Sequence, residues 1–363
     1  HVCAGNDLRP LRNGDEAYPA MLQAIDAARE YVFLSTYIFN AGRAAGAFAQ
    51  ALARAASRGA DVRLLVDGVG MLYSWHKPWK KLERHGVRTA VFLPLRLFPP
   101  QVGINLRNHR KILVCDGTGF TGGMNIADDN LSAGRDLRVQ DMHFQCRGPI
   151  VDQLRRAFLL DWGFCTGEYT PLPPATALPQ GASRCRVIMD GPGAGGNTLE
   201  DIYCGVINSA RKCIRVMTPY FLPSHALVAA LRSAAHRGVD VRVILPEKNN
   251  LIYVHWAQFR ILPVLLDAGV RVWLQPAPFA HSKLLAVDGH YSQIGSANLD
   301  GRSLRLNFEL NMEVFGASFH DILAAHMDHA VSVGREVTSI DLARQNLAVR
   351  LRNAGCWIFS PYL

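Results

Sequence analysis

The chain carries one pattern twice, and this internal repeat constrains its fold more than any other feature. Each copy has a histidine, a lysine two residues later, an aspartate five residues further on, and a glycine-containing turn that ends in asparagine. The copies are His109, Lys111, Asp116 and Asn125 in the first half, and His281, Lys283, Asp288 and Asn298 in the second. A repeat of this length predicts two domains that share one architecture.

The sequence around each copy also recurs. Residues 51–63 match residues 230–242 as an Ala/Leu helix, an Arg-Gly stop and an Asp-Val-Arg strand start. We expect helices at 18–29 and 199–210, strands at 32–37, 62–66, 112–114, 213–218, 241–245 and 284–287, and a further helix and strand in each half. Such alternation predicts an α/β fold: two homologous α/β/α domains with mixed sheets, related by a pseudo-twofold, with the active site at their interface.

The 363 residues suffice for two domains. We place the first at 1–172, with His109, Lys111 and Asp116, and the second at 173–363, with His281, Lys283 and Asp288. Prolines cluster between residues 170 and 180, which is typical of a linker. The first half is longer, with an insertion at about 96–107. It also has five residues between Asp116 and Gly122, one fewer than separate Asp288 from Gly295.

Two imidazoles and two ammonium groups suit the chemistry of a phosphate diester. One imidazole can attack phosphorus while the other protonates the leaving oxygen. The lysines can hold the phosphate oxygens as negative charge builds. If each motif lies in a strand, His109 and Lys111 point to one face, as do His281 and Lys283. Asn125 and Asn298 can donate amide hydrogens to the phosphate.

The aspartates of the motif have a structural interpretation. Asp116 and Asp288 each precede a glycine at the expected end of a strand, which favours a turn residue or a fixed ion pair over proton transfer. An imidazole that alternates between base and acid needs a carboxylate on its other nitrogen. Asp141 and Glu309 are better candidates for that position.

The charge is placed unevenly. The net charge is +9, and the segment from residue 75 to 111 holds nine Lys or Arg but one acid. Basic residues mixed with aromatic ones suit an anionic lipid surface, although nucleic-acid phosphates or a solvated face would also account for them. The candidate membrane-binding residues are Trp75, Lys77, Trp79, Lys80, Lys81 and Arg84. The chain has no run of 18 apolar residues, so we expect no membrane-spanning helix.

At these motifs the chain resembles the phospholipase D superfamily and, within it, bacterial cardiolipin synthases. The resemblance runs from residue 13 to about residue 315. It rests on Leu34-Ser-Thr-Tyr-Ile-Phe39, Asn108-His-Arg-Lys111, Arg147-Gly-Pro149, Asp161-Trp162, Thr218-Pro-Tyr-Phe221, Gly295-Ser-Ala-Asn-Leu-Asp-Gly-Arg-Ser303 and Asn307-Phe-Glu309.

The resemblance implies a two-step phosphatidyl transfer. His109 would be the nucleophile and form a phosphatidyl-histidine, and His281 would act as acid and then as base. Glu309 would pair with His109, and Asp141 with His281. Lys111, Lys283, Asn125, Asn298 and Ser296 would hold the phosphate, with no metal ion or other cofactor.

The expected substrates are phosphatidylglycerol and a second phospholipid, with phosphatidylethanolamine as another candidate. The expected location is the cytoplasmic side of a bacterial inner membrane, as a peripheral protein. The eight scattered cysteines fit a reducing compartment. Nucleic acid is not the expected partner, and the oligomeric state is left open. The alternative is hydrolysis with water as acceptor, by a phospholipase D or by a phosphodiesterase such as a nuclease.

Overall fold

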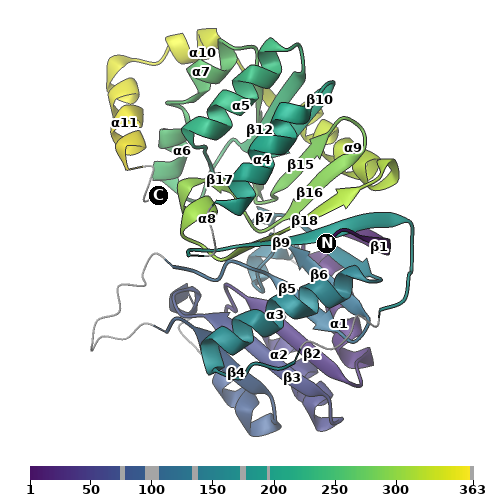
Figure 1. Ribbon diagram of the computed structural model, residues 1–363. Coiled ribbons are helices and arrows are strands. Elements are labelled where there is room, and N and C mark those ends of the chain that lie inside the picture. The colour runs from purple at the N-terminus through teal and green to yellow at the C-terminus, as the bar shows by residue number, and fades with distance from the viewer. Residues whose placement is uncertain (74–77, 95–105, 133–137, 172–176, 194–196, 360–363) are drawn as a thin grey trace. The chain divides into compact units, whose positions relative to one another are not determined.

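The computed structural model describes residues 1–363 except 74–77, 95–105, 133–137, 172–176, 194–196 and 360–363 (Figure 1). Contacts divide the chain into two compact units. The first contains His1–Met189 and Asn307–Met312, and the second contains Asp190–Leu306 and Glu313–Leu363. The linker expected near 170–180 falls within the first unit, and its residues 172–176 lie outside the described part. The sequence limits of the two repeats, at 172 and 173, therefore stay a prediction.

The first unit is built on a mixed sheet with the strand order β4-β3-β2-β5-β6-β8-β1-β9. Strands β2, β3 and β4 are parallel, whereas β5, β6, β8, β1 and β9 pair antiparallel to their neighbours. The strand bounds are β1 (Cys3–Arg12), β2 (Tyr31–Thr36), β3 (Asp61–Asp67), β4 (Arg88–Phe92), β5 (Ile112–Cys115), β6 (Thr118–Gly122), β8 (Met142–Arg147) and β9 (Ser183–Asp190).

Helices cover both faces of this sheet. Helices α1 (Asn13–Ala27) and α2 (Arg43–Ser57) share one hydrophobic core with alternate residues of β2, among them Val32 and Leu34. Phe33 points to the other face and stacks on Phe158 of α3 (Ile150–Thr166), with ring centroids 5.0 Å apart. The unit therefore has the α/β/α layers that the sequence predicts.

The second unit repeats this plan. Its strand order is β19-β13-β12-β10-β15-β16, and β10, β12 and β13 are parallel while β15 and β16 are antiparallel. Its strands are β10 (Cys213–Met217), β12 (Asp240–Pro246), β13 (Arg271–Gln275), β15 (Leu284–Val287), β16 (Tyr291–Gly295) and β19 (Arg335–Val337). Its longer helices are α4 (Thr198–Ser209), α5 (His225–His236), α9 (Ala317–Val333) and α11 (Leu347–Ile358). Strand β18 (Glu309–Phe315) begins in the first unit and ends in the second.

The repeated Arg-Gly positions explain part of the shared sequence. Arg58 follows α2 and donates to the carbonyl of Ile25 near the end of α1, at 2.9 Å. Arg237 follows α5 and donates to the carbonyl of Ile207 near the end of α4, at 3.2 Å. The next residue, Gly59 or Gly238, adopts a positive φ of 92° or 86° that ends the helix. The repeat thus fixes how each helix pair is joined.

One expected helix differs. The third helix of the first half is a 3₁₀ helix, η2 (Pro78–His85), whereas the second half has α6 (Ile252–Gln258) and α7 (Leu262–Leu266) at this place. Pro78 starts η2, and the segment has little apolar content beyond the buried Leu82. A short segment with so few apolar positions does not support a longer α-helix.

Candidate active site

The motif histidines and lysines lie just before strands β5 and β15, not within them. His109 and Lys111 precede Ile112, and His281 and Lys283 precede Leu284. The motif residues therefore lie at the strand ends, and strand alternation does not account for the directions of their side chains. Instead, each lysine folds back and donates from Nζ to the carbonyl oxygen of its own histidine. Both lysines are buried.

The His109 ring contacts a carboxylate. Its Nδ1 lies 3.1 Å from Oε2 of Glu309, whose side chain is fully buried, and both residues belong to the first compact unit. Since a carboxylate accepts, Nδ1 carries the hydrogen in this pair, and in the neutral ring Nε2 then keeps its lone pair. Asn307 holds the other carboxylate oxygen with its side-chain amide at 3.1 Å. Tyr37 packs edge-on to the ring, with centroids 5.3 Å apart.

A buried polar network supports the backbone around His109. Arg110 forms an ion pair with Asp161 of α3 and donates from Nε to the carbonyl oxygen of Glu309 at 3.0 Å. Asn108 also donates to Asp161, at 3.0 Å. Burial raises the pKa of Asp161, and the Arg110 guanidinium opposes that rise. The network therefore joins the residues on both sides of His109 to one carboxylate.

Asp67 completes this network at the end of β3. Its carboxylate accepts from the backbone amides of Asn108, Val69 and Gly70 at 2.8 to 2.9 Å. Burial raises the pKa of Asp67, although the amide hydrogen bonds oppose the rise. The sequence alone does not identify Asp67 and Arg110 as supports of the site. Arg110 belongs to the basic segment from residue 75 to 111, and the sequence signal for Asp67 is an acid at the end of a strongly apolar strand.

The second histidine has a different surrounding. Lys283 Nζ lies 3.0 Å from Nδ1 and 2.9 Å from Nε2 of His281. Tyr220 packs edge-on to this ring with centroids 6.3 Å apart. Phe279 is tilted against the ring at 5.8 Å. The His281 ring thus has a lysine beside it, where the His109 ring has a carboxylate.

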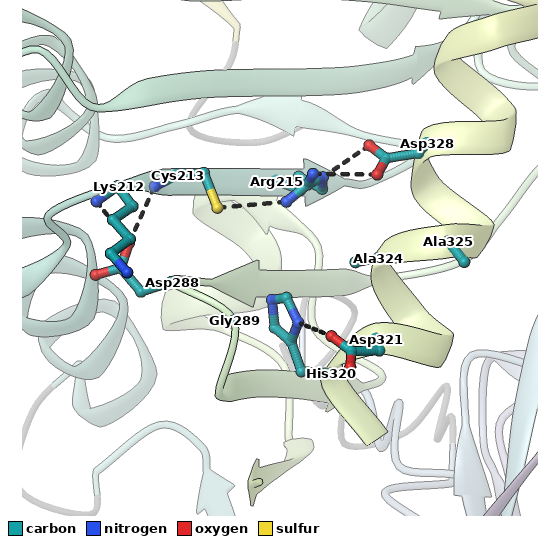
Figure 2. A pocket seen from close by; sticks show the side chains of 10 residues that line it. All are labelled: Lys212, Cys213, Arg215, Asp288, Gly289, His320, Asp321, Ala324, Ala325 and Asp328. Atoms are coloured by element: carbon teal, nitrogen blue, oxygen red, sulfur yellow. Dashed lines mark hydrogen bonds and ion pairs between the residues drawn. The ribbon is translucent and has the colours of Figure 1, made fainter. Parts of the chain in front are cut away.

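The motif aspartates are structural anchors. Asp116 accepts from the backbone amides of residues 29–31 at 2.9 to 3.2 Å. Asp288 accepts from those of residues 211–213 at 2.8 to 3.0 Å, two of which are drawn in Figure 2. Burial raises the pKa of Asp288, but the three amides and His290 outweigh it, so the pKa is lowered. Each carboxylate therefore ties its motif hairpin to the neighbouring strand of the sheet, which is β2 for Asp116 and β10 for Asp288.

The missing residue of the first copy lies in the hairpin loop. Cys115 pairs with Thr118, which leaves two loop residues, whereas Val287 pairs with Tyr291, which leaves three. Asp116 and Asp288 keep positive φ angles of 46° and 55°. The one-residue difference is therefore absorbed before the glycine turn.

Two of the remaining candidates for phosphate binding, Asn125 and Asn298, make hydrogen bonds within the protein. The side-chain oxygen of Asn125 accepts from the amide of Ile38 at 3.2 Å. Asn298 is buried and donates one amide hydrogen to Ser303 at 3.1 Å, which leaves its second hydrogen for another acceptor. Ser296 is also buried. Donation to a phosphate by these residues stays a prediction.

Asp141 explains why the first copy has glycine at the position of Ser296. A Cβ atom on Gly123 would meet Oδ2 of Asp141 at 2.7 Å, so the carboxylate fills the space of a side chain. Asp141 is buried and accepts from the amide of Met142 at 2.7 Å. Its neighbour His143 is fully buried as well, and burial lowers the pKa of His143 to about 4.

The structure divides the basic segment. Lys81 and Arg84 of η2 are exposed, whereas Arg107, Arg110 and Lys111 are buried near His109. Trp75, Lys77 and most of the insertion at 96–107 lie outside the described residues, and for Trp79 and Lys80 the description covers the backbone only. The basic residues of this segment therefore fall into two groups, one exposed on η2 and one buried near His109. Within the described ranges, no helix has both the length and the apolar content to cross a bilayer.

Figure 2 shows a pocket of about 480 Å³ in the second unit, beside Asp288. Its arginine, Arg215, is bound to Asp328 by two hydrogen bonds of 2.8 and 3.1 Å. His320 lines the pocket and pairs with Asp321 at 3.4 Å. Neither motif histidine lines it.

Known proteins resemble this chain along most of its length. A family model described as cardiolipin synthase, phospholipase D-like domain, matches residues 21–162 and 203–331. A probable cardiolipin synthase of Bacillus subtilis, YwiE, is 30% identical over 99% of the chain and 72% of its own length. The major cardiolipin synthase ClsA of the same organism is 30% identical over 99% and 76%. Cardiolipin synthase A of Pseudomonas putida is 35% identical over 99% and 76%.

Solved structures support the fold. The chain is similar to phosphatidylserine synthase of Haemophilus influenzae, with a TM-score of 0.73 and 16% identity over 98% of this chain and 95% of that one. Polyphosphate kinase of Porphyromonas gingivalis is similar with a TM-score of 0.60 and 14% identity, over 90% of this chain and 50% of that one. At such identities the likeness concerns the fold alone.

Proposed function

The chain belongs to the cardiolipin synthase family of phospholipase D-like proteins, and we propose that it makes cardiolipin from phosphatidylglycerol and a second phospholipid. It is a phospholipid phosphatidyltransferase. The observation that carries the proposal is the intact pair of His-x-Lys motifs, the first of which has its imidazole 3.1 Å from a buried carboxylate. Phospholipids are its substrates, and phosphatidylglycerol is the proposed donor.

In the proposed first step, Nε2 of His109 attacks the phosphorus of phosphatidylglycerol. The bond from phosphorus to the glycerol oxygen breaks, and His281 in its protonated form gives that oxygen a proton. Glycerol leaves and a phosphatidyl-histidine remains on His109. Glu309 supports the nucleophilic role of His109, because a carboxylate on Nδ1 stabilises the positive charge that the ring gains on forming the new bond.

In the second step, His281 removes a proton from a hydroxyl group of the second phospholipid. This oxygen attacks phosphorus, the bond to His109 breaks, and the product is released. With phosphatidylglycerol as acceptor, two molecules give one cardiolipin and one glycerol. We propose that Asp141 orients His281 in both steps, as the family resemblance implies.

Positive groups would hold the phosphate while charge develops on it. Lys111 and Lys283 are buried cations, and a cation removed from water acts more strongly on a nearby anion. Asn125, Asn298 and Ser296 are the proposed neutral donors. In this scheme the lysines neutralise the charge, so activity should survive chelation by EDTA. A loss of activity restored by added zinc would reject this part.

Analysis of lipid products by mass spectrometry tests the function directly. Purified protein is added to phosphatidylglycerol vesicles, with a His109→Ala variant as control. Cardiolipin together with free glycerol is the expected result. Phosphatidic acid instead would show that water is the acceptor and that the protein is a phospholipase D. Release of nucleotides from DNA or RNA, without lipid products, would show a nuclease.

We also propose that the protein works on the anionic surface of a bacterial inner membrane, from the cytoplasmic side. The exposed Lys81 and Arg84 support an electrostatic contribution from η2. Reversing the charges of Lys80, Lys81 and Arg84 should weaken binding to anionic vesicles and leave binding to neutral vesicles unchanged. Unchanged binding to anionic vesicles would show that η2 does not contribute to membrane binding.

A further inference from the structure

Helix α11 exposes a row of large apolar side chains. Leu347, Leu351 and Ile358 are 70%, 63% and 73% exposed. Successive helix residues are about 100° apart, so these three lie within about 40° of one another on the helix surface. Phe359, at the end of the helix, is 62% exposed. Single exposed apolar residues are ordinary, but several on one face of one helix indicate an interaction surface.

The opposite face of α11 is already occupied. Cys356 and Trp357 pack against the buried cluster of Leu222, Val254 and Ala257, and α11 contacts α6 along the second unit (Figure 1). Arg352 lies over the Trp256 ring of α6 at 4.2 Å. One face of the helix therefore packs on its own unit, and Leu347, Leu351 and Ile358 on the other face are exposed to solvent.

The charges beside this row have one sign. Helix α11 contains Arg350 and Arg352 and no acid. At about 100° per residue, the two arginines lie on opposite sides of the apolar row. Helix α6 adds exposed apolar residues at the start of the neighbouring helix: Leu251, Ile252 and Tyr253. An apolar row bordered by arginines is the pattern of a helix that lies in an anionic lipid interface.

We propose that the exposed face of α11, with Leu347, Leu351, Ile358 and Phe359, docks the second unit on an anionic phospholipid bilayer. The proposal rests on the proposed function, since phosphatidylglycerol is then both the substrate and the anionic lipid of that surface. The apolar side chains enter the acyl boundary while Arg350 stays at the level of the phosphates. A bilayer fits better than a protein partner because Arg350 beside the row complements anionic lipid headgroups and α11 contains no acid.

The test compares two double variants in sedimentation with phosphatidylglycerol vesicles. Leu347→Ser with Leu351→Ser should weaken vesicle binding about tenfold or more, since two large apolar groups no longer leave water. The matched control is Ile322→Ser with Val333→Ser on α9, where both residues are 50% exposed and lie away from α11 in the same unit (Figure 1). The control should bind like the wild type. Thermal unfolding checks that each variant is folded.

Arg350→Glu provides an independent variant that leaves the apolar row in place. It should weaken binding to phosphatidylglycerol vesicles and reduce the sensitivity of that binding to salt. Equal binding by the wild type, the leucine variant and Arg350→Glu would overturn the proposal. An equal loss in the leucine variant and the α9 control would also overturn it. If the wild type is a dimer by light scattering and the leucine variant a monomer with unchanged vesicle binding, the row instead binds a second copy.

Turnover separates this proposal from the proposed function. On short-chain phosphatidylglycerol in free solution, the leucine variant should transfer as fast as the wild type, because no surface is needed. On vesicles it should be slower in proportion to its weaker binding. If the wild type produces no transfer in either assay, the proposed function fails, while vesicle binding still decides the docking surface.

Discussion

The two motif copies hold their backbones alike. Asp116 accepts from three consecutive amides at the start of β2, and Asp288 accepts from three at the start of β10. Each motif lysine donates to the carbonyl of its own histidine. These shared contacts are local to each unit, so a duplicated segment can carry them unchanged. Both copies therefore keep the same backbone hydrogen bonds, and these hold a histidine and a lysine side by side.

The surroundings of the two imidazoles differ. The His109 ring lies against the Glu309 carboxylate, whereas both nitrogens of the His281 ring lie within 3.0 Å of the Lys283 ammonium. The first copy also has Gly123 in place of Ser296, and a buried His143 two residues after Asp141 where Asn311 stands two residues after Glu309. In the proposed mechanism, these differences would distinguish His109 as the nucleophile from His281 as the acid and base.

The largest expected effect follows from exchanging the histidines for alanine. His109→Ala should abolish transfer, because no other group forms the covalent bond. His281→Ala should slow transfer of glycerol-linked substrates by about 10²- to 10⁴-fold, which is the usual contribution of a general acid. It should keep slow attack on a substrate with a good leaving group, measured by release of that group. The reverse result would exchange the two roles.

The next effect concerns the carboxylates. Glu309→Gln keeps the size of the side chain but removes the charge on Nδ1 of His109, so kcat should fall about 10²- to 10⁴-fold with little change in KM. Asp141→Asn should have an effect of similar size through His281. Glu336→Gln, at an exposed pair with Arg271, is the control and should leave kcat unchanged. Normal kcat in Glu309→Gln would show that its contact with His109 is structural only.

His143 should make the first unit sensitive to acid. Its pKa is about 4 in the folded protein, because burial disfavours the charged ring, against an ordinary value of 6.5. The unfolded chain therefore takes up a proton first, and stability is lost as the pH falls from about 6.5 to 4. The loss amounts to about 3 kcal/mol. His143→Asn, which copies the residue of the second half, should remove this dependence in denaturant unfolding curves.

Equal acid sensitivity of the wild type and His143→Asn would contradict that assignment. The measurement compares the free energy of unfolding at pH 7.5 and pH 4.5 for both proteins. A mutation that lowers stability equally at both pH values has a packing cause and leaves the difference between the two conditions intact.

The smallest expected effects test whether the two aspartate anchors are equivalent. Asp116→Ala and Asp288→Ala should each lower the free energy of unfolding by about 2 kcal/mol, since three amides lose a charged acceptor. The pKa of Asp288 is lowered, so its contribution is present above the ordinary carboxyl range and is lost as the pH falls through that range. Retained activity at a permissive temperature is expected in both variants, and loss of activity without loss of stability would give the aspartates a chemical role.

Local sequence patterns were enough to predict most of the elements. Strand β15 has the limits expected for it, and β3 extends the expected strand by one residue at each end. Apolar runs and Gly stops act over short distances, so they can be recognised without the fold. The 3₁₀ helix η2 was missed because Pro78 and a sparse apolar pattern compete with the helix expected from the repeat.

The site was predictable in its motifs but not in its support. His109 and Glu309 are 200 residues apart, and Arg110 and Asp161 are 51 apart, so no periodicity relates them. The resemblance to a family supplied the first pair, and nothing in the pattern supplied the second. Arg107 and Arg110 belong to the basic segment from residue 75 to 111, but sequence alone does not show that they are buried, because it does not tell which cations acquire buried partners.

The covalent adduct tests the central claim most directly. Wild-type protein and His281→Ala are mixed with phosphatidylglycerol, quenched, digested and examined by mass spectrometry for a phosphatidyl group. We expect the group on the peptide that contains His109. In His281→Ala it should form slowly from phosphatidylglycerol, because the first step lacks its acid, and persist once formed, because the second step lacks its base. A phosphatidyl group on His281, or transfer to product with no adduct at any time after mixing, would contradict the account.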